Sequence, residues 1–173
     1  AFVLLTIALA SMIILSQGTA VLVVSEVESG RIVHAERIEP GDVFTVRWIH
    51  SVELEPWEEQ FEIGNDMKIY LDQTRFKAFG AGVPDSAGTS TEVNDGYVSF
   101  SGIHKEMPNL VYGVSPVAKH AFTINGKTLR LYELLPPDTA VSFSIARLSL
   151  WKYFVSNLWF SLMQILEKPI LAG

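Results

Sequence analysis

The chain has 173 residues, of which 49% are hydrophobic and 18% charged, and its formal net charge is −6 at pH 7. This length fits one domain with short additional segments. The 13 Lys and Arg residues are scattered, which argues against binding to nucleic acid, and the lack of cysteine excludes disulfides, thiolate metal sites and a cysteine nucleophile.

The first segment in chain order is the apolar run AFVLLTIALASMIIL, and no charged residue occurs before Glu26. About 20 apolar residues span the hydrocarbon core of a bilayer. We therefore predict an uncleaved N-terminal membrane anchor over residues 1–20. A secretory signal peptide is the alternative, because the small residues of SQGTA fit a cleavage site.

From Val21 onward the hydrophobic pattern alternates with a period of two, which predicts an extracytoplasmic β domain over residues 21–147. Many short strands separated by turn residues favour a mainly β fold, an antiparallel sandwich or barrel, over a parallel sheet. The predicted strands include 21–27, 31–38, 44–50, 57–63, 67–79, 97–101, 111–114 and 119–124, followed by TLRLYEL and TAVSFSI.

Two stretches between these strands stand out by composition. Asn125–Gly126 supplies the positive φ angles of a type I′ turn and predicts a hairpin. The span 80–96, GAGVPDSAGTSTEVNDG, is too long for a plain hairpin loop, so we interpret it as a mobile flap or a functional loop.

The last segment, residues 148–173, returns to a helical period and predicts an amphipathic C-terminal helix. Its aromatic content, with one Lys near its start, suits a membrane interface or a membrane partner. The alternatives are a second membrane span over Leu148–Leu166 and a helix that caps the β domain. The residues expected to contact membrane or partner are Trp151, Phe154, Leu158, Trp159 and Leu162.

A candidate site comes from the strand pair in RWIHSVELEPWEEQFEI. His50 shares a face with Val46 and Trp48, and Glu59 shares a face with Trp57 and Phe61, so both polar side chains are predicted to point inward. If Leu54 and Glu55 form a two-residue loop, His50 lies opposite Glu59 and the two can satisfy one another.

Two interpretations of this pair remain open. It is either a structural pair that orders a hairpin tip, or part of a ligand or metal site completed by the 80–85 loop, whose residues are Gly80, Gly82, Pro84 and Asp85. Two ligands are too few to assign a metal. A hydrolase using Ser51 is disfavoured, since Ser51 faces away from His50 and no G-x-S-x-G elbow is present. We expect no enzyme, no cofactor and no bound metal.

The His50–Glu53 run, the following Glu59-x-Phe61 and the Gly80–Pro84 turn resemble a small bacterial and archaeal family, a domain of unknown function encoded beside or fused to TAXI-type TRAP transporters. The similarity covers residues 31–143. It transfers His50, Glu53, Glu59, Gly80, Gly82 and Pro84 as motif positions without catalytic roles.

This resemblance implies an accessory subunit of a TRAP solute transporter at the inner (cytoplasmic) membrane, with the β domain on the extracytoplasmic side. Its partners would be the transporter's membrane subunit, membrane lipid and the solute-binding protein. The competing hypothesis is a small-ligand or metal-binding module, or a hydrolase, working at His50, Glu59 and the 80–85 loop.

Overall fold

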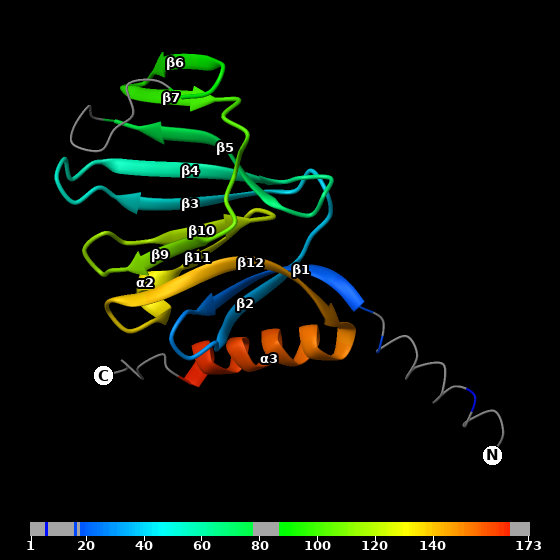
Figure 1. Cartoon of the computed structure of the whole chain (residues 1–173). Coiled ribbons are helices and arrows are strands. Elements are labelled where there is room, and N and C mark those ends of the chain that lie inside the picture. Colours follow the sequence, from blue (N-terminus) through cyan, green and yellow to red (C-terminus); the bar gives the residue numbers. More distant parts are fainter. Residues whose placement is uncertain (1–5, 7–15, 17, 78–86, 167–173) are drawn as a thin grey trace, which may run out of the picture.

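The computed structural model describes Thr6, Ser16 and residues 18–77 and 87–166, without the side chains of residues 159–161 and 163–166. Two antiparallel sheets make up most of the described chain, which confirms the mainly β, antiparallel prediction (Figure 1). The choice between a sandwich and a barrel stays a prediction. In Figure 1 the strands form a column, with β6 and β7 at the top and helix α3 below β1 and β2.

The smaller sheet has four strands, in the order β2 (Ile32–Arg37), β1 (Gly18–Glu26), β12 (Thr139–Ser149) and β9 (Leu110–Val114). The larger sheet has eight. Its order is β11 (Lys127–Arg130), β10 (Ala121–Ile124), β3 (Val43–Ile49), β4 (Pro56–Ile63), β5 (Ile69–Phe76), β7 (Tyr97–Ser101) and β6 (Ser90–Asn94), with β8 (Lys105–Glu106) paired to β5. The helices are α2 (Leu131–Leu134) and α3 (Leu150–Leu166).

The main core lies between the two sheets, where inward-facing side chains of strands from both sheets meet. Phe44 stacks on Phe61 with ring centroids 5.0 Å apart, and Phe143 of the small sheet stacks on Phe44 at 5.7 Å. A second, smaller cluster covers the same face of the large sheet beyond the small one, and consists of Trp57, Phe76, Val98 and Phe100. The large sheet therefore extends past the small one toward β7.

Turn chemistry accounts for two hairpins. Asn125 and Gly126 have φ of 49° and 72°, which confirms the predicted positive-φ turn between β10 and β11. Asp95 and Gly96 have φ of 50° and 76° and join β6 to β7. The interpretation of residues 80–96 as one irregular loop was therefore wrong at its C-terminal end, because the Asp-Gly pair closes a hairpin there.

The predicted strand TLRLYEL is only half a strand. β11 ends at Arg130, and the next four residues form the short helix α2, with Leu131 fully buried in the main core. The local pattern of alternating residues did not reveal this change.

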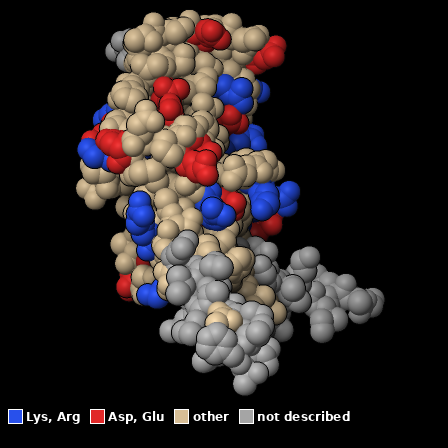
Figure 2. Space-filling view, turned by 90° about the vertical axis from the view of Figure 1, so that its right-hand side faces the viewer, with Lys and Arg blue, Asp and Glu red and all other residues tan. Residues whose placement is uncertain are grey.

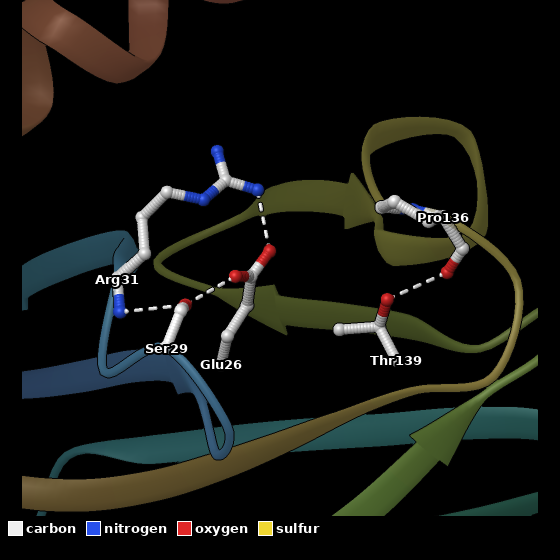
Figure 3. A network of polar contacts seen from close by, with 5 residues as sticks. All are labelled: Glu26, Ser29, Arg31, Pro136 and Thr139. Atoms are coloured by element: carbon white, nitrogen blue, oxygen red, sulfur yellow. Dashed lines mark hydrogen bonds and ion pairs between the residues drawn. The ribbon is translucent and has the colours of Figure 1, made fainter.

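The β1–β2 turn is held by polar contacts around Glu26 (Figure 3). Ser29 and Arg31 each donate a hydrogen bond to the Glu26 carboxylate at 2.5 Å, and these two contacts lower its pKa below the ordinary value. Nearby, the Thr139 hydroxyl donates to the Pro136 carbonyl at 2.7 Å, just as β12 begins. The turn and the start of β12 are therefore fixed by side-chain hydrogen bonds.

The first and last strands pair along their length. β1 and β12 run antiparallel, with Gly18 opposite Ser149 and Glu26 opposite Val141. β1 starts at Gly18, so residues 18–20 of the predicted anchor segment belong to the sheet, while residues 1–17, apart from Thr6 and Ser16, lie outside the described residues. The β domain likewise runs to Ser149, two residues beyond its predicted end.

Helix α3 packs against β2 and β12 on the outer face of the small sheet. Val21, Val23 and Ala35 belong to that outer face, outside the main core, and are nevertheless buried. The side-chain amide of Asn157 donates to the Ala35 carbonyl (2.9 Å) and accepts from the Ala35 N–H (3.4 Å). Asn157 of the helix therefore satisfies the N–H and C=O of Ala35 on the edge strand β2. These backbone groups would otherwise be open to pairing with another strand.

Among the residues that the structure describes, neither helix combines the length and apolar character needed to cross a bilayer.

Candidate functional site

The β3–β4 hairpin ends in a four-residue loop, residues 51–54. The His50 N–H donates to the Glu55 carbonyl (2.9 Å) and the Leu54 N–H donates to the His50 carbonyl (3.0 Å), and Leu54 takes a positive φ of 57°. The imidazole Nδ1 of His50 contacts the carboxylate of Glu53. His50 and Glu53, two of the motif positions, thus form a local pair at the hairpin tip.

The predicted pairing of His50 with Glu59 was wrong. The β3–β4 register places Glu59 opposite Val46 and Arg47 opposite Glu58. His50 lies four positions further along its strand than Val46, which corresponds to about 13 Å. The error arose from the assumed loop length, because a four-residue loop shifts every cross-strand partner. The observed register therefore separates His50 from Glu59, the two residues on which the alternative ligand site depended.

Glu59 does point inward, as its alternation with Trp57 and Phe61 indicated. It accepts a hydrogen bond from the hydroxyl of Tyr112, which lies on β9 in the other sheet. Burial raises the pKa of Glu59 above its ordinary value, and the Tyr112 hydrogen bond and the charge of Lys105 partly offset the rise. Burial and the nearby Glu59 raise the pKa of Tyr112, so its hydroxyl remains a donor. This contact bridges the two sheets.

A row of aromatic rings connects the hairpin tip with the Glu59–Tyr112 contact. His50 stacks on Trp57 (5.4 Å between centroids), Trp57 on Trp48 (5.7 Å), and Trp48 lies 5.6 Å from Tyr112 and 6.1 Å from His120. Offset contacts of this kind stabilise a cluster beyond its area burial. The cluster therefore gives the tip a rigid support.

Two buried polar groups in this cluster have protein partners. The indole N–H of Trp57 donates to the Thr74 hydroxyl at 2.9 Å, and His120 Nδ1 accepts from the Ser115 N–H at 3.4 Å. Burial lowers the pKa of His120, which keeps the ring neutral. Buried polar groups of a structural cluster are normally hydrogen-bonded, and these two groups are.

The remaining histidines lie elsewhere. His34 contacts Glu36 at 3.3 Å, and His104 stacks on Tyr70 with centroids 4.5 Å apart. In the described ranges, no group of three or more His, Asp or Glu side chains is arranged to hold a metal ion. The motif residues Gly80, Gly82, Pro84 and the neighbouring Asp85 fall outside these ranges, so the predicted role of their loop stays untested.

The outer face of the large sheet carries a polar hollow that sequence reasoning missed. Glu58 contacts Arg47 (3.3 Å) and Arg75 (2.6 Å) on the two neighbouring strands. Beside them lies a hollow of about 170 Å³, lined by Thr45, Glu58, Gln60, Gln73 and Arg75. The signal was present in the sequence as polar residues at every second position of three adjacent strands.

The predicted membrane or partner residues lie on α3. Trp151, Phe154, Leu158 and Leu162 are exposed at 62%, 57%, 62% and 44%, whereas the side chain of Trp159 is not among those described. The helix is amphipathic, as predicted, and its polar Asn157 and Ser156 lie on the side nearer the sheet.

Comparison with known families decides what kind of protein carries this architecture. A family model described as a domain of unknown function, DUF1850, matches residues 44–131, about half of the chain. The chain belongs to the DUF1850 family. The DUF1850 match runs from β3 to the start of α2 and includes His50, Glu53 and Glu59.

The part of this DUF1850 protein outside the match contains β1, β2, β12 and α3, with most of the small sheet. No curated protein and no solved structure matches the chain. The expected membership in an uncharacterised domain family is confirmed, and it brings no activity with it.

Proposed function

We propose that this DUF1850 protein is a membrane-held accessory subunit of a TAXI-type TRAP solute transporter. In this role it binds the transporter's membrane subunit from the extracytoplasmic side of the inner membrane. It aids assembly of the transporter or docking of the solute-binding protein, and has no catalytic role of its own.

The observation that carries the membrane part is the pairing of Gly18 with Ser149. The apolar run of residues 1–15 precedes Gly18 in sequence, and α3 starts directly after Ser149. Two apolar segments from opposite ends of the sequence therefore join the β domain at one point of one strand pair. This arrangement supports a β domain held close to a bilayer by one of its ends.

The transporter part draws on the resemblance of the motif residues to the family encoded beside TAXI-type TRAP transporters. The structure is compatible with a binding role for the motif, because His50 and Glu53 hold a hairpin tip whose Val52 and Leu54 side chains are 67% and 68% exposed. Exposed apolar residues on an ordered tip are suited to contact another protein.

The test is affinity purification of the tagged full chain from native membranes in a mild detergent. We expect the transporter's membrane subunit to be recovered with it. A tagged variant with Val52→Asp and Leu54→Asp should lose that subunit, whereas the matched change Val93→Asp on β6, where Val93 is 74% exposed, should retain it. Recovery of the tagged chain alone, from membranes that contain the transporter, would reject the proposal.

A further inference from the structure

Helix α3 is docked with its polar side toward the β domain, the reverse of an ordinary surface helix. Asn157 pairs with the backbone of Ala35, and Tyr153 lies beside Arg37 of β2 and interacts with Asn157. Soluble proteins turn the apolar face of such a helix toward their core. The apolar face of α3 must therefore have a use outside the β domain.

The outward face of α3 is a continuous apolar strip. Its members recur at helical spacing along three turns and are exposed at 44–62%: Trp151, Phe154, Val155, Leu158 and Leu162. A strip of this kind on a soluble monomer is uncommon unless it serves as an interaction surface. The strip begins in the first turn of the helix, next to the point where Gly18 meets Ser149.

Two basic side chains lie near the start of α3, and the acidic Glu36 also acts there, because burial and the Glu36 charge raise the pKa of Tyr153. Lys152 is the one charged residue in the sequence 150–166, and Arg37, opposite Val21 on the outer face of the small sheet, is exposed on β2, against which α3 packs. Glu36, next to Arg37, lies on the other face of β2, where it contacts His34. Figure 2 shows Lys and Arg side chains above the grey atoms on this side of the molecule, with Asp and Glu side chains among them.

These features fit one occupant, the surface of an anionic lipid bilayer. Interfacial helices bury their apolar face at the boundary between headgroups and acyl chains, and Lys or Arg beside them bind anionic headgroups. The apolar run of residues 1–15, next in sequence to β1, favours lipid over a protein partner.

We infer that α3 lies on the headgroup region of an anionic bilayer, with its strip from Trp151 to Leu162 in the lipid and Arg37 and Lys152 on phosphate groups. This inference rests on the proposed membrane location and names the partner of α3. It assigns the apolar strip to lipid and leaves the hairpin tip for the transporter.

The chain has no cysteine, so single-cysteine variants report single positions. The full chain is placed in vesicles of phosphatidylcholine alone, or of phosphatidylcholine with phosphatidylglycerol, with an environment-sensitive fluorophore at Leu158→Cys. Thr128→Cys on the exposed strand β11 is the matched control. We expect a blue shift and a several-fold loss of quenching by aqueous iodide at position 158 in vesicles with phosphatidylglycerol, and neither change at position 128.

The charge contribution is tested by Arg37→Gln and Lys152→Gln. Each change should weaken partitioning of the full chain into phosphatidylglycerol vesicles at low salt on the order of fivefold, with little effect on pure phosphatidylcholine. Equal iodide access at positions 158 and 128 would overturn the inference, as would shielding that is independent of anionic lipid. These vesicles contain no transporter, so such failures leave the purification test of the proposed function unaffected.

Discussion

The hydroxyl of Tyr112, on β9 of the small sheet, donates a hydrogen bond to the carboxylate of Glu59, on β4 of the large sheet. The two residues are 53 positions apart in sequence and belong to different layers of the main core. A buried acid without a partner would be strongly unfavourable. This contact is therefore the polar link that the inward orientation of Glu59 requires.

Replacement of Tyr112 by Phe should lower the free energy of unfolding by about 1–3 kcal/mol, because Glu59 would lose its hydrogen-bond donor in a partly buried position. Urea denaturation in detergent measures the change. Tyr70→Phe is the matched control, since Tyr70 donates to Asp66 at an exposed site (2.8 Å), and should cost clearly less than Tyr112→Phe. Equal losses in the two variants would contradict the role given to the buried contact.

The stability of the protein should depend on the protonation of Glu59. Because burial raises its folded pKa above the ordinary value of 4.5, the folded state holds the proton more tightly than the unfolded chain. The resulting stabilisation is complete below 4.5 and is lost as pH rises through the folded pKa. The difference in unfolding free energy between wild type and Glu59→Gln, followed over pH, isolates this contribution from His34 and His120. A pH-independent difference would show that the two states hold the Glu59 proton equally.

Replacement of Asn157 by Ala should loosen α3 from the edge strand. It removes both hydrogen bonds to the backbone of Ala35, and we expect a loss of about 1–2 kcal/mol in unfolding free energy with faster amide exchange in β2 and α3. Hydrogen-exchange mass spectrometry gives the regional rates. Lys152→Ala, on the outward side of the same helix, serves as the control and should leave exchange in β2 unchanged.

Replacement of His50 by Gln separates a structural pair from a ligand site. We expect a loss of roughly 0.5–1 kcal/mol, because the contact with Glu53 is partly exposed, and no change in solute uptake by cells. Glu53→Gln should give a similar loss, and the double variant should be less destabilised than the sum of the two. Normal stability combined with lost uptake would instead favour the ligand-site hypothesis.

How much of this architecture the sequence predicts depends on the kind of pattern. Alternation of Phe44, Val46 and Trp48 correctly predicts a strand and its inward face, because side-chain direction follows a period of two. The alternation does not predict the register between two strands. Position 54 of the β3–β4 loop takes a positive φ but carries Leu instead of Gly or Asn. No residue type therefore marked the length of this loop, and the cross-strand partner of His50 was predicted wrongly.

The faces of α3 follow the same rule. Periodicity separates a polar side from an apolar one, but it does not reveal which side is docked. That is decided by Asn157, whose amide can donate and accept at once and so matches both free backbone groups of Ala35. The edge position of β2 is a property of the whole sheet order, and local sequence does not encode it.

The ladder between β1 and β12 has a consequence for how the protein is made. Residues 18–26 of β1 pair with residues 141–149 of β12. β1 is therefore synthesised long before β12, and the edge of β1 that β12 covers stays unpaired until then. Contacts so distant in sequence form late and slowly. Until then the apolar β1 has an open edge prone to aggregation, and the small sheet can close only after synthesis of β12 is complete.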